Sequence, residues 1–228
     1  MTCSVGPAGE AAMRLVFEAD PAPELTRTLL AIQKSAQRHF QGTLTDSVIG
    51  YATLTLFFKP LQFQRDRVEA WLLDQVDLTK SDTHCDPPPA IILPVFYHPS
   101  VGPDLEWLAD DKGLSVDDII ALHSGATYFA YATGFAPGFC YLGTLPSQLM
   151  APRLATPRSK VPPGSVAIAD LQTAVYPCES PGGWRLIGQC PQPLFNLRHT
   201  PANLLSVGDT VRFEPVSEAD FYAMGGAR

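Results

Sequence analysis

Charged residues are scarce in this 228-residue chain, and the short motifs of the common nucleotide-binding and hydrolytic sites are missing. Charged side chains make up 17% of the residues, whereas about 25% is usual. Neither G-x-x-x-x-G-K-S/T nor G-x-G-x-x-G occurs, so the sequence shows no autonomous phosphate-binding loop. The G-x-S-x-G turn is missing too, and an α/β-hydrolase is therefore not indicated.

The cysteines and histidines lack the spacing of a metal site or a disulfide framework. There are five cysteines, an odd number, and no C-x-x-C pair occurs. The five histidines show no metal-ligand spacing either. This pattern is typical of a reduced protein of the cytoplasm, and we expect no metal in this chain.

Basic residues and long apolar runs are too few for two further classes. The chain has 16 Lys and Arg against 23 Asp and Glu, a formal net charge of −7, which argues against nucleic-acid binding. No apolar run approaches the roughly 18 residues that a membrane helix needs. Residues 1–17 contain one cation, Arg14, and no long apolar region, so no signal peptide is evident. We therefore expect a cytoplasmic protein without a membrane or nucleic-acid partner.

Proline, by contrast, is abundant and unevenly distributed. The chain has 22 prolines, where average usage would give about 11. Ten of them lie between Pro137 and Pro193. Because proline fixes φ, loops rich in it are ordered without regular hydrogen bonding. Such loops are where binding sites tend to lie, although plain connections between strands would give the same composition.

The same part of the chain is free of acidic residues. None occurs in the 51 positions between Asp118 and Asp170, where the only formal charges are Arg153, Arg158 and Lys160. Arg153 and Arg158 each follow a proline, which restricts the backbone and favours a pair of guanidinium groups held for a carboxylate or phosphate. A pair of solvated arginines, or arginines bonded to loop carbonyls, is the alternative.

Hydrophobic periodicity predicts a small α+β unit at the N-terminus. We expect the order β-α-β-α-β, a ferredoxin-like arrangement spanning residues 1–89 with residues 90–97 as its last strand. Three consecutive prolines at 87–89 are the clearest signal of a loop or a domain boundary. The expected elements are a strand at Met13–Glu18, a helix from Pro23 to Ala36, a strand at Ser47–Phe58, a helix at Gln62–Val76 and a strand at Ala90–Tyr97.

Residues 98–228 are predicted to form two short helices followed by a compact β-barrel or sandwich. Gly113 is a C-cap signal for the first helix, and Ser115 starts a capping-box-like sequence for the second, which runs to about His123. After Gly125 the helical period gives way to short apolar segments separated by glycine and proline turns. The expected strands are Thr127–Thr133, Ser165–Ala169, Gln172–Tyr176, Trp184–Ile187 and Val211–Glu214.

Two further features are candidates for chemistry. His123 ends a helix near the start of the acid-free stretch, where it is either a proton-transfer group or a favourable contact with the helix dipole. The turn at residues 181–184, Pro-Gly-Gly-Trp, could receive an anion on its amides, with Trp184 as an apolar wall. A tryptophan buried in the core is the alternative.

The glycines, prolines and aromatic residues of the second half resemble a known signature. Residues 134–143 read GFAPGFCYLG, similar to the GF-x-PGF-x-YLG signature of the family that contains the 5-oxoprolinase B subunit, allophanate hydrolase subunit 1 and the Kip-type inhibitor of a sporulation histidine kinase. Three places depart from the family: residues 97–99 read Tyr-His-Pro where Tyr-Gly-Gly is usual, Gln189 stands where an arginine is common, and Asp170 where a glycine is usual. The likeness spans roughly Ala11 to Pro215 and includes residues 102–105, 122–124, 152–153, 157–158, 161–168, 172–173, 176–177, 180–184, 186–188 and 208–213.

This resemblance implies a fold and a set of partners. It implies an α+β protein with a small N-terminal domain and a cyclophilin-like β-barrel, the latter over residues 98–228. It also implies a 5-oxoprolinase C subunit (an allophanate hydrolase subunit 2 homologue) and an A subunit as partners. With these the chain would act in ATP-dependent opening of 5-oxoproline to glutamate, and it would not be active alone. The family leaves two alternatives: a regulatory protein that inhibits a sensor histidine kinase, and a carboxyltransferase-type subunit of an allophanate or urea system.

The resemblance and the residue types together give a set of expected site residues. We expect His123 to orient or transfer a proton and Arg153 and Arg158 to clamp an anion, with ATP shared with the partner subunits. The residues expected to shape the substrate pocket are Phe135, Pro137, Gly138, Phe139, Tyr141, Gln172, Tyr176, Gly182, Gly183 and Trp184.

Overall fold

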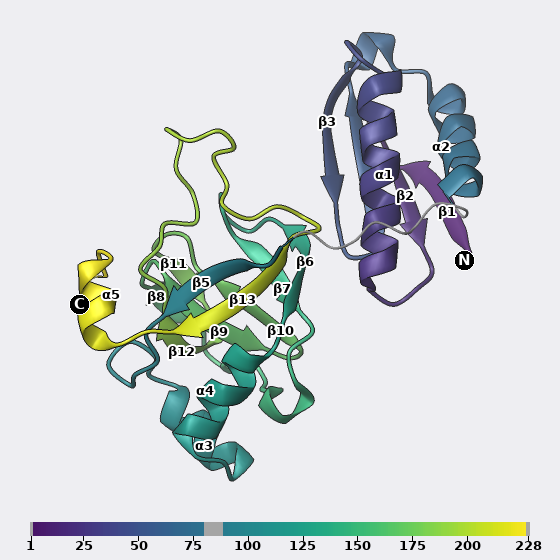
Figure 1. Cartoon of the computed structure of the whole chain (residues 1–228). Coiled ribbons are helices and arrows are strands. Elements are labelled where there is room, and N and C mark those ends of the chain that lie inside the picture. Colours follow the sequence, from purple (N-terminus) through teal and green to yellow (C-terminus); the bar gives the residue numbers. More distant parts are fainter. Residues whose placement is uncertain (1, 80–88, 227–228) are drawn as a thin grey trace. The chain divides into compact units, whose positions relative to one another are not determined.

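The computed structural model describes residues 2–79 and 89–226, and the chain divides into two compact units, residues 1–86 and 87–228. In the first unit, two helices lie against one face of a four-stranded antiparallel sheet of order β1-β2-β4-β3 (Figure 1). Its elements are β1 (Cys3–Pro7), β2 (Ala12–Phe17), α1 (Pro23–His39), β3 (Leu44–Ile49), β4 (Thr53–Phe58), the 3-10 helix η1 (Pro60–Gln62) and α2 (Arg65–Thr79).

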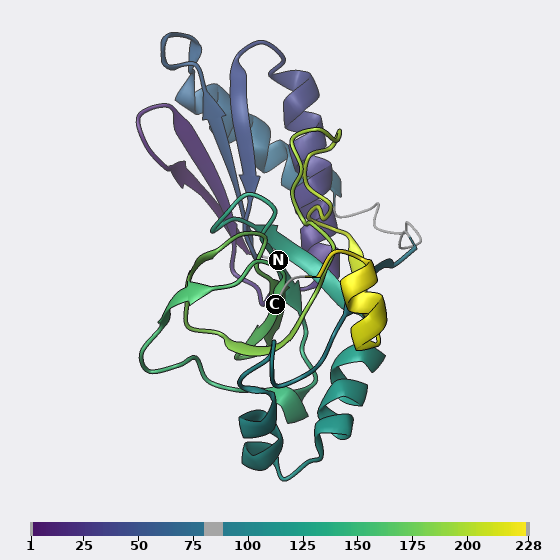
Figure 2. The same ribbon diagram turned by 90° about the vertical axis from the view of Figure 1, so that its left-hand side faces the viewer.

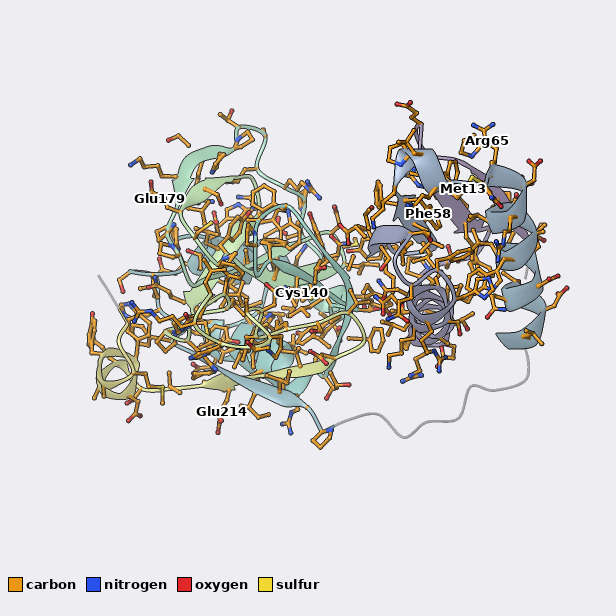
Figure 3. The ribbon with its side chains drawn as sticks, turned by 90° about the horizontal axis from the view of Figure 1, so that it is seen from above. Met13, Phe58, Arg65, Cys140, Glu179 and Glu214 are labelled. Carbon is orange, nitrogen blue, oxygen red and sulfur yellow. The ribbon has the colours of Figure 1, made fainter. Side chains whose placement is uncertain are left out.

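The apolar pattern explains this packing. Helix α1 begins at Pro23, and its residues Leu25, Leu29, Ile32 and Ala36 are all buried, as their spacing predicts. Buried side chains of β2 and β4 complete the layer between the sheet and the helices. Figure 3 shows this filled layer, with Met13 and Phe58 inside it and Arg65 at its edge.

The element order of this unit differs from the expected β-α-β-α-β and is ββαββα. The segment predicted as one strand, Ser47–Phe58, contains a hairpin turn at Gly50, whose N–H donates to the carbonyl of Thr53 (2.8 Å). The run of β-branched and aromatic residues conceals this turn. Strand β1, which the sequence pattern did not predict, pairs with β2 at the sheet edge.

The second unit is built on a seven-stranded sheet of order β12-β9-β10-β7-β6-β13-β5. The α+β class with a barrel is therefore confirmed. Helices α3 and α4 pack together at one end of the sheet (Figures 1 and 2). The elements are β5 (Ile91–Val95), α3 (Leu105–Lys112), α4 (Val116–Gly125), β6 (Tyr128–Thr133), β7 (Cys140–Gly143), η2 (Ser147–Leu149), β8 (Arg158–Val161), β9 (Ser165–Ala169), β10 (Gln172–Val175), β11 (Ser180–Gly182), β12 (Arg185–Gln189), β13 (Thr210–Pro215) and α5 (Glu218–Ala223).

Strand β5 corrects the expected assignment of residues 90–97 to the N-terminal domain. It pairs in parallel with β13 and so belongs to the barrel. Just beyond it, Phe96 and Gln189 exchange two backbone hydrogen bonds of 2.9 Å, which join the two ends of the sheet. Pro94 fits this position, because a proline in a strand has no N–H to donate on its outer side. The three prolines at 87–89 lie largely outside the described residues.

Both faces of the central strands are covered. Along β9, Val166 and Ile168 enter a large core shared with α3 and α4, whereas Ala167 and Ala169 enter a second, aromatic-rich core. Cys140 lies in the first core, as Figure 3 illustrates, and burial raises the pKa of its thiol to about 12. Across the described residues, no helix combines the length and apolar character of a membrane span.

The loop before α3 makes a backbone contact that admits only glycine. A Cβ on Gly102 would lie 2.6 Å from the backbone nitrogen of Gly188, in β12, and backbone atoms cannot move aside as a flexible side chain does. We expect Gly102→Ala to lower the free energy of unfolding by about 1–3 kcal/mol or more. Denaturant unfolding of the purified chain measures this.

Gly125→Ala is the matched control, because a Cβ at Gly125 meets no atom within 4 Å. This variant should change the free energy of unfolding by at most about 1 kcal/mol, in the stabilising direction, since alanine favours the helix. Equal stabilities for the two variants would contradict the close approach of residue 102 to β12.

Candidate functional site

A cleft of about 520 Å³ opens on the barrel beside the proline-rich loops. Arg158 and Lys160 contribute cations to it, Tyr176 and Gln189 contribute polar groups, and no acidic residue is among the described residues that line it. Lys160 is paired with Glu179 (3.2 Å), which lies outside the lining. The described lining residues themselves carry only positive formal charge. Six prolines form much of the cleft wall, namely Pro103, Pro162, Pro163, Pro177, Pro191 and Pro193.

Arg158 is held in this cleft by a buried carboxylate. Its Nη2 lies 3.0 Å from Oδ1 and 2.9 Å from Oδ2 of Asp104, and its Nη1 donates weakly to the carbonyl oxygen of Trp184 (3.4 Å). The side chain of Asp104 is only 7% exposed, whereas that of Arg158 is 27% exposed. Within the described chain, Nε of Arg158 has no hydrogen-bond partner.

Asp104 also binds a second arginine. Arg185 Nη1 lies 3.6 Å from Oδ1 of Asp104, and its Nε donates to the carbonyl of Pro152 (3.3 Å). The Arg185 guanidinium lies over the ring of Trp107, 3.6 Å from its centroid, which is a cation–π contact. Two guanidinium groups thus share one carboxylate, and the cluster carries a net positive charge.

Tyr176 joins the cleft to the aromatic core. Its ring contacts those of Phe135 and Phe139 edge-on, and Phe139 continues the contact to Tyr141 and Trp184. Burial raises the pKa of the Tyr176 phenol, which is therefore a neutral hydrogen-bonding group at neutral pH. Of the ten residues expected to shape the pocket, Tyr176 is the one that lines this cleft.

The other nine expected pocket residues lie behind or beside the cleft. Phe139 and Trp184 are buried in the aromatic core, where they support Tyr176. Gly182 is required there because a Cβ would collide with the Tyr176 hydroxyl. The remaining positions are Phe135, Pro137, Gly138 and Tyr141 in the loop before β7 and in that strand, Gln172 at the start of β10, and Gly183 beside Pro157.

Phe135 is the strained member of this loop. It has a φ of 70°, in the left-handed region that bulky residues rarely adopt, and 59% of the residue is exposed. Its ring rests against Phe139 at a centroid distance of 5.2 Å. An aromatic residue held exposed in this way is typical of a functional surface.

Arg153 does not line the cleft with Arg158. Its guanidinium lies 5.7 Å above the ring of Trp184, and its Nε is 4.0 Å from a carboxylate oxygen of Asp170. Asp170 has a φ of 52° in the turn between β9 and β10, a conformation that glycine adopts without strain, as the resemblance implies for this position. The expected two-arginine clamp is thus reduced, in this cleft, to Arg158 with Lys160.

His123 occupies the barrel core and does not line the cleft. It is fully buried, its Nδ1 accepts from the Tyr97 hydroxyl (2.7 Å), and its Nε2 donates to Thr173 Oγ1 (2.9 Å). Thr173 in turn donates to the carbonyl of Ala167 (3.1 Å), which assigns the proton to Nε2. Desolvation lowers the pKa of His123 to about 3. In this structure His123 is a neutral hydrogen-bonded link in the core, and its expected catalytic role stays a prediction.

Sequence reasoning missed Asp104 and Arg185. An aspartate just before a helix is usually an N-cap, so Asp104 attracts no attention by its type. Gln189 was noted only as a departure from the resembled pattern, and its Nε2 donates to the carbonyl of Pro163 (2.8 Å) at the cleft wall. One signal could have pointed to Asp104. The arginines of the acid-free loops have no carboxylate nearby in sequence, so a partly buried arginine there needs a carboxylate from another part of the chain, and Asp104 supplies it to Arg158 and Arg185. In the described part of the chain, no group of three His, Cys, Asp or Glu side chains is placed to hold a metal.

Comparison with known proteins identifies the class to which this chain and its fold belong. The family model described as carboxyltransferase domain, subdomain C and D, matches residues 3–205. The fold also matches the crystal structure of TTHA0988, with 33% identity and a TM-score of 0.77 over 90% of this chain and 40% of that one. The Kluyveromyces lactis urea carboxylase shares the fold at 15% identity, with a TM-score of 0.70 over 97% of this chain and 22% of that one.

Within this class the curated relatives are more specific. The chain is 36% identical to the 5-oxoprolinase B subunit of Haemophilus influenzae over 92% of its own length and 96% of the relative. It is 47% identical to the 5-oxoprolinase B subunit of Bacillus subtilis over 58% of its own length, a match that covers 55% of that relative, little more than half. The chain belongs to the family of 5-oxoprolinase B subunits, which are carboxyltransferase-type proteins, as the resemblance had implied.

The buried imidazole predicts a pH dependence of stability. The unfolded chain takes up a proton at His123 near its ordinary pKa of 6.5, but the folded chain does so only at a pKa of about 3. The difference in proton binding at His123 therefore costs no free energy of unfolding above pH 6.5, and it lowers the free energy of unfolding as the pH falls from 6.5 toward 3. The expected slope is about 1.4 kcal/mol per pH unit.

Denaturant unfolding at several pH values between about 7 and about 4 tests this. His123→Gln should lack this component of the slope, although it is less stable at neutral pH because it breaks the Tyr97–Thr173 link. His199→Gln, in an exposed loop, should keep the slope of the original chain. Parallel curves for the original chain and His123→Gln would contradict the assignment.

Proposed function

We propose that the chain is the B subunit of an ATP-dependent 5-oxoprolinase and acts in a complex with a C subunit homologue and an A subunit. Family membership and the names of the curated relatives support the subunit role. The observation that carries the substrate assignment is the acid-free cleft with Arg158 fixed at its wall. A small carboxylate such as 5-oxoproline is complementary to it in charge and small enough to enter it.

The groups of the cleft suit both ends of this substrate. The carboxylate of 5-oxoproline would accept hydrogen bonds from Arg158, the kind of charge-assisted contact that guanidinium groups make best. The lactam ring would lie against the proline walls, and its N–H and carbonyl would meet the Tyr176 hydroxyl and the Gln189 amide. Gln189 leaves the cleft less basic than an arginine would, so Arg158 and Lys160 supply its positive charge.

The reaction requires more than this chain provides. Ring opening adds one water across the lactam C–N bond: hydroxide joins the carbonyl carbon, and the ring nitrogen, with added protons, becomes the glutamate ammonium group. An unstrained lactam resists this step, and hydrolysis of ATP to ADP and phosphate, which uses a second water, supplies the driving force. The partner subunits therefore complete the site, and we assign no nucleotide loop to this chain.

A carboxyltransferase-type role is the second candidate, because the family model is that of a carboxyltransferase domain. That reaction needs a biotin carrier as a co-reactant, which the same reconstitution can supply or omit. Glutamate formation that is independent of biotin favours the 5-oxoprolinase.

The proposal is tested by co-expressing the chain with its A and C partners and measuring glutamate formed from 5-oxoproline with and without ATP. We expect activity only with all three subunits and ATP. Arg158→Ala should raise KM for 5-oxoproline by about 10–100-fold, since it removes charge-assisted hydrogen bonds worth about 1.5–3 kcal/mol.

Arg212→Ala provides the matched control, because Arg212 is an exposed arginine on β13 outside the cleft. Its KM should stay within about twofold of the original value. If the three-subunit complex forms no glutamate, the proposed activity is overturned. If KM for 5-oxoproline is unchanged in Arg158→Ala, the cleft is not the binding site for 5-oxoproline.

A further inference from the structure

We propose that Asp104 is a positioning residue that fixes the Arg158 guanidinium as the receptor for the substrate carboxylate, with Arg185 as its second, structural counterion. The inference rests on the proposed function, in which the cleft takes 5-oxoproline. It adds a residue that lies outside the cleft and that acts through Arg158.

The first support is where the Asp104 side chain points. Asp104 stands at the N-cap position of α3, yet its side chain makes no capping hydrogen bond to that helix. Instead Oδ2 accepts from the backbone N–H of Leu186 in β12 (2.7 Å), and the Asp104 N–H donates to the carbonyl of Leu186 (3.0 Å). The carboxylate is thus fixed by the barrel wall, in the orientation that meets Arg158.

The second support is the different use of the two arginines. The Arg185 side chain is 15% exposed and directs its guanidinium to the Trp107 ring and the Pro152 carbonyl, and Arg185 does not line the cleft. Arg158 lines the cleft and keeps Nε without a partner in the described chain. One guanidinium therefore anchors the carboxylate, and the other is presented to a ligand.

The third support is physical. A free arginine side chain loses rotamer freedom when it binds a ligand, and a guanidinium already held in place avoids most of that loss. Removing the Asp104 charge has two opposing effects on an anion: it removes a repulsion, and it releases Arg158 from its position. Because a guanidinium out of position loses its short charge-assisted hydrogen bonds altogether, we expect the loss of position to dominate.

The test uses the three-subunit complex with two substrates, 5-oxoproline and its carboxamide, which lacks the carboxylate. Asp104→Asn should raise KM for 5-oxoproline by about 10-fold or more, change kcat by less than about threefold, and leave KM for the carboxamide nearly unchanged. In an Arg158→Ala background, Asp104→Asn should have no further effect on KM. If Asp104 had a merely structural role, Asp104→Asn would raise KM for both substrates, and it would do so in the Arg158→Ala background as well as in the original chain.

Asp111→Asn is the control in the same helix, because Asp111 is an exposed acid paired with Lys112 (2.8 Å). It should leave both KM values unchanged. An unchanged or lower KM for 5-oxoproline in Asp104→Asn, in an active complex, overturns the positioning role but leaves the proposed function intact.

Direct binding separates the remaining outcomes. Calorimetry of the full chain with 5-oxoproline should show that Asp104→Asn weakens binding by about the same factor as its KM rises. If the complex makes no glutamate but the chain binds 5-oxoproline in this Asp104-dependent way, the proposed activity falls and the positioning role stands. If the complex is inactive and the chain binds no 5-oxoproline, both are overturned.

Discussion

One buried carboxylate organises the basic end of this barrel. Oδ2 of Asp104 accepts the backbone N–H of Leu186 at 2.7 Å, both of its oxygens contact the Arg158 guanidinium, and Oδ1 also contacts that of Arg185. Asp104 thereby ties the start of α3 to β12 and β8, three elements far apart in sequence. Removing one partner from such a buried network leaves the others uncompensated, which costs more than the pair contributes when intact. The cleft depends on this arrangement, because it gives the cleft an immobile cation without an exposed acid.

The local structure was largely predictable from the sequence. The helical spacing of Leu25 and Leu29 and the capping box at Ser115 predicted two helices, and both helices are present in the structure. The order in which the strands pair was harder to predict from the sequence. The strand Ile91–Val95 follows the N-terminal unit in sequence, yet it pairs with the distant strand β13, because parallel pairing with Val211–Pro215 and the bridge from Phe96 complete the barrel. No local pattern reports such a distant partner.

The site was predictable in composition and not in geometry. The proline excess and the acid gap pointed to loops that line the candidate cleft, and Arg158 lies among its lining residues. The same reasoning also selected Arg153 and His123, which lie over Trp184 and inside the core. Residue type cannot tell a histidine that faces a ligand from one whose two nitrogens are satisfied by Tyr97 and Thr173, because burial depends on the whole fold.

The central claim is that this cleft receives the carboxylate of 5-oxoproline, and the most direct measurement is a crystal structure of the reconstituted complex with that compound bound. The account predicts that the carboxylate lies within hydrogen-bond distance of the Arg158 guanidinium, that Asp104 still holds Nη2 of that arginine, and that the lactam ring contacts the proline walls. Density for 5-oxoproline elsewhere in the complex, with the cleft occupied only by solvent, would contradict it.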